Sequence, residues 1–294
     1  MTGATDEPQW RPIGCIDPFR LKDARLQAHH AVQWLARVAR AHISPQPDDG
    51  HTCLHWDSGR DAFVTQSFAR DTRLLLQIPT LTLTLQSGEG MAGSPCLALG
   101  GQTDAQVRQW LGEQFVARSL DPSPLDDPPP YEIPMHAIGQ GTAYEAQAAA
   151  DALANLTAWY ANAAAVLEGV RRRIAAQGLA VSPLCCWPHH FDLAALTMLP
   201  AGRSADTGTV GIGLSPGDEY YAEPYFYVSV YPDPNPATFP RLPKIGTWHT
   251  RDFTAAVATA HQILATEHPA IETSEFLRDA VGASLKLSGQ TPQV

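Results

Sequence analysis

The chain has 294 residues and a formal net charge of −10. Hydrophobic residues make up 44% of it, enough to build a sizeable core and to exclude a wholly disordered chain. Charged residues are only 17%, against about 25% in an average globular protein, and 25 residues are prolines, which is an excess. The acidic balance argues against nucleic acid as a partner, because phosphate binding needs clustered lysine and arginine.

The first ten residues, MTGATDEPQW, have neither the basic start nor the apolar stretch of a signal peptide. No run of about 18 apolar residues predicts a membrane span, so we expect no membrane partner. The five cysteines are an odd number and include no CxxC pair. This pattern indicates reduced thiols and predicts a cytoplasmic protein.

The N-terminal half begins with a predicted helix over residues 23–42, in which apolar residues recur every three or four positions. The segment SPQPDDG after it predicts a turn. A second helix is predicted from Thr103 to about Arg118. Between the two helices, short apolar and aromatic segments predict strands at 51–57, 62–68, 80–86 and 96–99. Of these, TLTLTLQ alternates leucine with threonine without a break, as a half-buried antiparallel strand does.

A proline-rich segment, 121–141, contains DPSPLDDPPPYEIP and shows no apolar period. We interpret it as a strap between two halves. The C-terminal half then begins with a long predicted helix over 143–177, where Thr142 and Glu145 form a capping box. The rest of this half predicts strands at 189–197, 209–214, 225–231 and 245–249, and helices at 252–266 and 273–285.

Each half is therefore predicted as a helix, an antiparallel β-meander and a helix, which together make an α+β fold. The predicted organisation is an N-terminal half 1–120, the strap 121–141 and a C-terminal half 142–294. Ser44-Pro45 and Ser182-Pro183 both follow the first helix of their half, and a histidine stands seven residues after each serine. This register suggests that the halves are a duplication, with a chance match as the alternative.

The segment HTCLHWD, 51–57, predicts the strongest chemical site. On a strand, His51, Cys53, His55 and Asp57 share one face, and all four are good metal ligands or acid–base groups. The two histidines would lie about 13 Å apart, too far for one ion, so only neighbours two residues apart could share a metal. On a helix the two histidines would face together, but the turn before them favours a strand.

The segment CCWPHHFDLA, 185–194, predicts a second site. As a strand it places His190 and Asp192 on one face, where the aspartate can hold the histidine tautomer and raise its basicity. In the alternative, structural interpretation, His189 lies at the edge of the core and Asp192 accepts hydrogen bonds from loop amides.

A third segment, 214–227, joins a Ser-Pro-Gly-Asp turn to an unusually aromatic strand. Tyr225 and Tyr227 are candidates to line a pocket for a small organic ligand, and His249 follows on a later strand or loop. An ordinary hairpin with aromatic packing is the alternative. Three carboxylates near the turn are candidates to serve the histidines: Asp218, Glu219 and Glu223.

Three short motifs resemble an uncharacterised bacterial family, a domain of unknown function. They are Ser182-Pro183 leading into FDLA, Ser215-Pro216-Gly217, and Glu223-Pro224 before the aromatic strand. The spacing of His51 and His55 is also similar to that family. The resemblance covers most of the chain loosely and implies no particular activity.

From these segments we expect a small-molecule enzyme with a polar site between the two halves. Its sharper form depends on a divalent metal, zinc or non-haem iron, that activates water or oxygen. The candidate metal ligands are His51, His55, His190 and His249. The candidate general bases are Asp192 and Glu223, and the candidate substrate pocket is lined by Tyr225 and Tyr227. The alternative is a non-catalytic ligand-binding or interaction protein whose histidines are structural.

Overall fold

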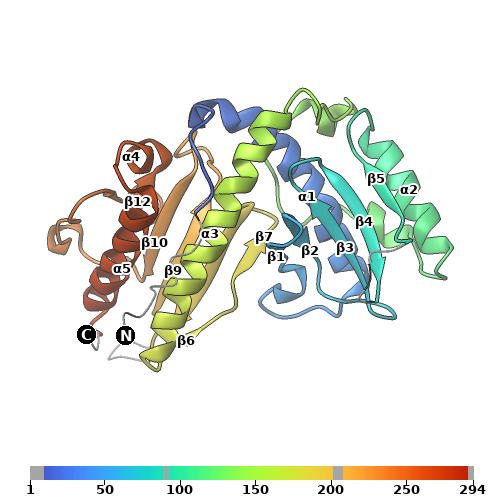
Figure 1. Cartoon of the computed structure of the whole chain (residues 1–294). Coiled ribbons are helices and arrows are strands. Elements are labelled where there is room, and N and C mark those ends of the chain that lie inside the picture. The colour runs from blue at the N-terminus through green and yellow to red at the C-terminus, as the bar shows by residue number, and fades with distance from the viewer. Residues whose placement is uncertain (1–9, 89, 91–92, 201–207, 291–294) are drawn as a thin grey trace, which may run out of the picture. The chain divides into compact units, whose positions relative to one another are not determined.

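The computed structural model describes residues 10–88, 90, 93–200 and 208–290. Residues 1–9, which the sequence analysis compared with a signal peptide, lie outside the described residues. The described chain consists of α-helices and antiparallel sheets, and the predicted α+β class is confirmed (Figure 1). It divides into two compact units. Unit 1 comprises Met1–Phe19, Ala158–Leu184 and Asp192–Val294, and unit 2 comprises Arg20–Thr157 and Cys185–Phe191.

The two units divide the chain at other positions than the predicted halves, which stay a prediction. The expected strap, 121–141, belongs to unit 2, as does the first part of the long helix α3 (Ala150–Ala176). A short later segment, Cys185–Phe191, also returns to unit 2. The duplication inferred from the Ser-Pro register stays a prediction.

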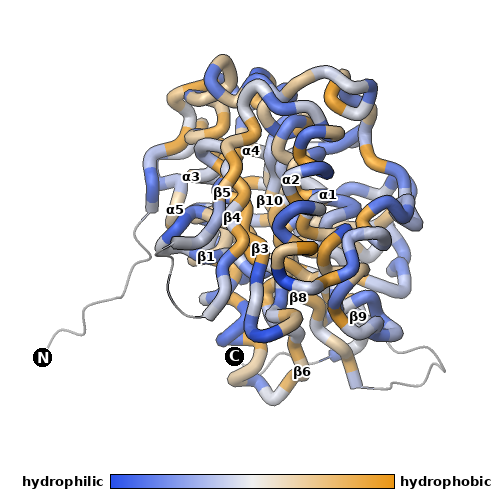
Figure 2. The backbone as a smooth tube through the Cα atoms, turned by 90° about the vertical axis from the view of Figure 1, so that its right-hand side faces the viewer, coloured by the Kyte–Doolittle hydropathy of each residue, from blue (hydrophilic) through white to orange (hydrophobic). Residues whose placement is uncertain are grey.

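Unit 2 contains an antiparallel sheet in which the strands follow one another in chain order. Residues 72–77, TRLLLQ, form a strand that the sequence analysis did not predict. Hydrophobic residues run along β3 and β4, as Figure 2 shows, and their leucines are almost fully buried. The strands are β1 (His55–Asp57), β2 (Ala62–Val64), β3 (Thr72–Gln77), β4 (Thr82–Ser87) and β5 (Cys96–Ala98).

Two helices of unit 2 confirm predictions from apolar spacing. Helix α1 (Lys22–His42) packs against β3 from behind the sheet in Figure 1 and is buried along most of its length. Helix α2 (Asp104–Val116) begins after Thr103, whose side chain and backbone form a capping box with Gln106. Every residue of 24–36 in α1 is buried, polar ones included, so packing on all sides stabilises this helix.

A disulfide within unit 2 corrects the expectation that all five cysteines are reduced. Cys53 and Cys185 are bonded across a sequence separation of 132 residues, with their Cα atoms 5.5 Å apart. Next to this bond, Leu54 and Cys186 exchange backbone hydrogen bonds of 3.1 and 2.8 Å. The disulfide therefore fixes the residues just before β1 beside strand β7 (Cys185–Trp187).

Unit 1 contains a second antiparallel sheet in the order β11-β12-β10-β9-β8-β6. Strand β10 has the predicted bounds of the aromatic strand and pairs with β9 on one side and β12 on the other. The strands are β6 (Ala180–Val181), β8 (Asp192–Met198), β9 (Thr209–Ser215), β10 (Tyr225–Tyr231), β11 (Thr247–His249) and β12 (Ala255–Thr259).

One face of the unit 1 sheet is covered by helices (Figure 1). Helix α5 (Pro269–Leu287) contacts β9, β10 and β12, and Trp159 of α3 packs near Phe226 of β10. On the other face, strand β9 carries Gly213, where an added Cβ would lie 2.5 Å from the Tyr227 ring. Glycine is therefore required there for the tyrosine to lie flat across its neighbouring strand.

The long predicted helix begins later than expected. Residues 143–149 form turns and a bridge, because Tyr144 exchanges backbone hydrogen bonds with Gly101 and Gln102 and is 1% exposed. These tertiary contacts take the place of the capping box that Thr142 and Glu145 were expected to form.

The predicted helix 252–266 is also corrected. Its first part is strand β12, which pairs with β10 and β11, and only α4 (Ala260–Leu264) is helical. A capping box of Thr259 and Gln262 starts this short helix. Pairing on both sides therefore outweighs the helical preference of the alanines in this segment.

None of the helices in the described ranges combines the length and the apolar character that crossing a bilayer requires.

Candidate functional site

The structure corrects the expected strand 51–57. His51 lies in a 3-10 helix, Gly50–Thr52, and only His55–Asp57 is a strand. The cause is local, because Thr52 donates both its backbone N–H and its hydroxyl to the carbonyl of Asp49, which has a left-handed backbone. The His51 ring is 6% exposed, and its Nδ1 accepts the backbone N–H of Gln46 at 3.2 Å. His51 and His55 therefore do not share a strand face.

His190 lies in a turn rather than on the strand that was expected to carry it with Asp192. The N–H groups of His190 and Phe191 both donate to the carbonyl of Trp187, and Phe191 is left-handed with φ of 59°. The rings of His189 and His190 lie 4.2 Å apart. Burial and the neighbouring His190 lower the pKa of His189 to about 4.

A buried histidine of α1, His29, binds the turn at 188–191. The ring Nε2 of His29 lies 2.9 Å from the carbonyl oxygen of Pro188, and the ring stacks on Phe191. Gln33 donates to the same carbonyl. Burial lowers the pKa of His29 to about 4, so the ring is neutral at pH 7 and donates from Nε2.

His249 lies on β11 in unit 1 and uses both ring nitrogens within that unit. Its Nδ1 is 3.0 Å from the Tyr221 hydroxyl, and its Nε2 is 2.6 Å from the Arg251 carbonyl. The ring also stacks on Phe253 with the centroids 4.2 Å apart. Because the carbonyl only accepts, Nε2 donates and Nδ1 accepts the tyrosine proton. Metal binding at either nitrogen would break one of these bonds.

Taken together, the predicted ligands do not form a cluster. Among the residues that the structure describes, no group of three or more histidine, cysteine, aspartate or glutamate side chains is arranged to hold a metal ion. The metal-dependent form of the enzyme hypothesis stays a prediction.

Three residues from the predicted catalytic and pocket sets do come together in unit 1. The Tyr227 hydroxyl donates to the Asp192 carboxylate at 2.5 Å, and the Tyr225 ring lies 6.1 Å from that of Tyr227. Tyr225 donates in turn to Asp218 at 2.5 Å, and Asp218 also accepts two backbone N–H groups of its own turn. Burial, followed by the nearby Asp192, raises the pKa of Tyr227 well above its ordinary value. We call these four residues the tyrosine–aspartate cluster.

Glu223, the other predicted general base, caps a helix. Its carboxylate accepts the backbone N–H of His261 at 2.7 Å, at the start of α4, and the residue is 6% exposed. A carboxylate at this position satisfies an N–H that has no partner within the helix. This contact accounts for the burial of Glu223, and its role as a general base stays a prediction.

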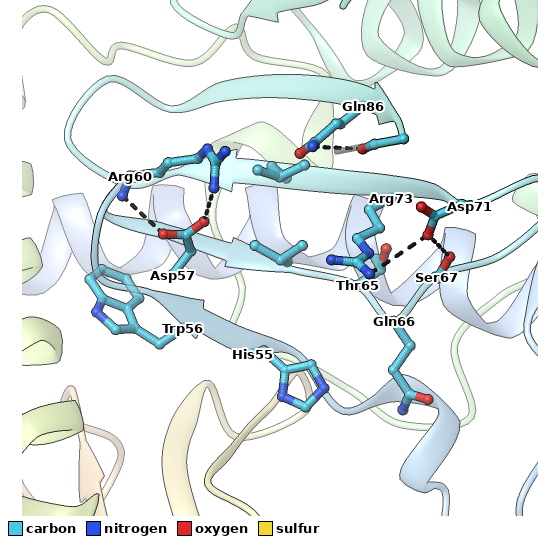
Figure 3. A pocket seen from close by; sticks show the side chains of 13 residues that line it. His55, Trp56, Asp57, Arg60, Thr65, Gln66, Ser67, Asp71, Arg73 and Gln86 are labelled. Carbon is cyan, nitrogen blue, oxygen red and sulfur yellow. Dashed lines mark hydrogen bonds and ion pairs between the residues drawn. The ribbon is translucent and has the colours of Figure 1, made fainter. Parts of the chain in front are cut away.

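A cleft of about 680 Å³ lies on one face of the unit 2 sheet. The strand register places His55, Val64 and Leu75 in one row across β1, β2 and β3, and Arg73 lies two residues along β3 from Leu75. These side chains therefore project from the same face. Figure 3 shows this face with its labelled polar side chains. The other lining residues are Trp56, Asp57, Arg60, Thr65, Gln66, Ser67, Asp71, Gln86 and Gly88.

Both acidic residues of the cleft are held by partners within unit 2. The Asp57 carboxylate accepts the Arg60 guanidinium at 2.5 Å and two backbone N–H groups of its turn. Asp71 accepts the Ser67 hydroxyl at 2.7 Å. Figure 3 shows these contacts at opposite ends of the cleft.

The amide and hydroxyl groups of the cleft are held in the same way. Gln66 and Gln86 donate to the carbonyls of Gly50 and Gly88, and Thr65 accepts the N–H of Leu74. Such groups shape the cleft wall without needing a ligand.

Two polar side chains of the cleft differ from the rest. Neither Arg73 nor His55 makes a side-chain hydrogen bond to another residue in the described ranges. The closest carboxylate oxygen to the Arg73 guanidinium, from Asp71, is 3.7 Å away, and both side chains of that ion pair are about half exposed. Partial burial lowers the pKa of His55 below 6.5, and the positive charge of Arg73 lowers it further. The cleft therefore presents a guanidinium and a neutral imidazole to solvent.

Sequence reasoning identified His55 but missed Arg73. The segment TRLLLQ gives no polar pattern that points to a site, since three leucines follow the arginine. Only the pairing of β2 with β1 and β3 brings Arg73 to the same face as His55.

Comparisons with family models, with curated proteins and with solved structures find no match for this chain. The resemblance to an uncharacterised bacterial family stays a prediction.

Proposed function

We propose that this chain binds a small polar molecule in the cleft of unit 2. The observation that carries the proposal concerns Arg73 and His55. Neither makes a side-chain hydrogen bond to another described residue, whereas the carboxylates, amides and hydroxyls named above do. Both side chains are open to solvent, so a ligand in the cleft can replace the water at their polar atoms without breaking a hydrogen bond within the protein. The volume of about 680 Å³ agrees with this, since small-molecule sites span about 300–1,000 Å³.

A binding screen with a blocked cleft tests the proposal. Val64 projects into the cleft from β2, so Val64→Trp fills it, whereas Val116→Trp adds the same ring at an exposed position of α2. The panel covers neutral sugars, carboxylates, phosphates, amines and nucleotides, and the readout is the change in Tm. At least one compound is expected to raise the Tm of the wild type and of Val116→Trp but not of Val64→Trp.

The proposal is overturned if no compound raises the Tm, or if Val64→Trp responds like the wild type. Should circular dichroism show that Val64→Trp is unfolded, Ser67→Trp blocks the cleft from an exposed rim position and takes its place.

A small-molecule enzyme that uses the same cleft is the second candidate. The observation that favours it is the neutral His55 ring, since an imidazole with a pKa near or below 6.5 can accept a proton at pH 7. In this version His55→Gln abolishes turnover of a compound found in the screen while the compound still binds. Elemental analysis of the purified protein tests the zinc or iron form of this hypothesis.

A further inference from the structure

Of the four charged side chains that line the cleft, three make hydrogen bonds within the described part of the chain and Arg73 does not. Asp57 and Arg60 neutralise one another in a direct contact, and Asp57 accepts two further N–H groups. Asp71 accepts a hydroxyl and lies 3.7 Å from Arg73. The N–H groups of Arg73 are therefore the main hydrogen-bond donors in the cleft that a ligand can use. A guanidinium has five N–H donors in a planar fork that matches a carboxylate or phosphate.

The geometry of the sheet sets Arg73 opposite His55. In the register of the sheet, His55 on β1 lies opposite Leu75 on β3, two strand spacings away. Arg73 lies two residues from Leu75 along β3. At ordinary strand spacing the Cα atoms of His55 and Arg73 are therefore about 12 Å apart. Both side chains line the cleft from that distance (Figure 3). A small acidic group in the cleft can therefore contact side chains from both strands.

We propose that the ligand of this cleft carries a carboxylate or phosphate group that binds between the Arg73 guanidinium and the His55 imidazole. This inference rests on the proposed function and names the chemical class of its ligand. Cationic ligands are disfavoured because Arg73 faces them without a hydrogen-bonded counter-ion. Neutral ligands leave the charge of the guanidinium without a bonded anion, whereas an anion makes short, charge-assisted hydrogen bonds with it.

Anion binding is also linked to proton uptake at His55. The charged groups that face this part of the cleft are Asp57, Arg60, Asp71 and Arg73, and the first two form a closed pair. An anion beside Arg73 offsets the positive charge that lowers the pKa of His55. The pKa of His55 therefore rises when the anion binds, and the complex takes up protons where His55 titrates.

Isothermal titration calorimetry of the full chain tests the ligand class with four probes. Glucose 6-phosphate and inorganic phosphate supply the phosphate, succinate supplies the carboxylate, and glucose is the uncharged match. At least one anion is expected to bind about tenfold more tightly than glucose. Arg73→Gln is expected to raise the Kd of that anion by about 10-fold to 100-fold. Arg20→Gln, which removes a positive charge from an exposed position, is expected to leave its Kd within twofold.

Proton uptake is measured by repeating the titration near pH 6.5 in buffers with different ionisation enthalpies. The wild type is expected to take up a fraction of a proton per anion beyond the probe's own change, and His55→Gln to lose that fraction while it still binds. The inference is overturned if glucose binds in the cleft as tightly as the anions, if Arg73→Gln binds like the wild type, or if proton uptake is unchanged in His55→Gln. Each of these results leaves the proposed function standing. That function fails only when no compound of the screen raises the Tm, or when Val64→Trp responds like the wild type.

Discussion

The unit 1 sheet and the unit 2 sheet each carry polar side chains on one face, but they satisfy them differently. In the tyrosine–aspartate cluster of unit 1, both tyrosine hydroxyls donate to carboxylates at 2.5 Å. In the unit 2 cleft, Arg73 and His55 make no side-chain hydrogen bond to another described residue. Buried hydrogen-bonded groups of this kind stabilise a fold, whereas exposed groups beside a cleft that make no hydrogen bond to the protein are available to a ligand. The difference moves the candidate site from Asp192 to the cleft.

The largest expected effect concerns how unit 2 holds the strand that lines its cleft. Cys53 and Cys185 close a loop of 132 residues, and loss of such a disulfide lowers the free energy of unfolding by about 2–5 kcal/mol. The Cys53→Ser, Cys185→Ser double variant is therefore expected to unfold at a lower urea concentration than the wild type.

A thiol count checks the premise of this prediction. Unfolded, unreduced protein is expected to expose the three free thiols of Cys15, Cys96 and Cys186. Five reactive thiols without reductant would show that the bond is absent, and equal stability of the double variant would show that it contributes nothing.

The next prediction compares the stability lost when a buried and an exposed tyrosine hydroxyl are removed. Tyr227→Phe removes the donor to Asp192, which is 8% exposed, and is expected to lower the free energy of unfolding by about 1–3 kcal/mol. Tyr220→Phe removes the same chemical group, bonded to the exposed Asp252, and is expected to cost less than about 0.5 kcal/mol. Urea unfolding of both variants measures the difference. Equal losses would contradict a structural role for the tyrosine–aspartate cluster.

A smaller effect depends on pH and on unit 2. The folded His29 has a pKa of about 4, against 6.5 for an ordinary histidine, so below pH 6.5 the unfolded chain binds a proton that the folded chain does not. Stability is thus complete above pH 6.5 and is lost as the pH falls toward 4. Between pH 7 and pH 5 this group accounts for a loss of about 2 kcal/mol.

The His29→Gln variant isolates that contribution, because glutamine retains a donor for the Pro188 carbonyl but does not titrate. Urea unfolding at pH 7 and pH 5 is expected to show a smaller pH dependence in this variant than in the wild type. His261→Gln, at an exposed position of unit 1, serves as the control and is expected to behave like the wild type. If His29→Gln retains the full pH dependence, another group causes it.

The sequence predicted the elements whose signals are local. The apolar spacing of α1, the Thr103 cap of α2 and the aromatic strand β10 all appear close to their expected bounds. The class of the fold follows from these elements, because alternating and helical periods require different partners for their apolar faces.

The errors arose where hydrogen bonds, local in one case and between strands in the other, outweigh the pattern of residue types. The alternation in HTCLHWD suggested a strand, but hydrogen bonds to the Asp49 carbonyl close a 3-10 turn at His51. The alanines of 255–258 suggested a helix, but pairing on both sides makes them a strand.

The candidate site was predicted only in part, because strand pairing rather than sequence spacing brings its residues together. His55 was identified because its neighbours in sequence are ligand types, whereas Arg73 follows no recognisable motif. Its relation to His55 exists only once β1, β2 and β3 pair in register. The bond between Cys53 and Cys185 depends on the fold as well, because no spacing rule links cysteines so far apart in sequence.

The most direct test of the cleft as a binding site is the NMR signal of His55 in protein labelled with ¹³C at its histidines, assigned with His55→Gln and followed during addition of glucose 6-phosphate. If the cleft is the binding site, the His55 ring resonance shifts and saturates with the same Kd that calorimetry gives, while the His261 resonance does not shift. Saturable binding that leaves the His55 resonance unmoved would contradict it.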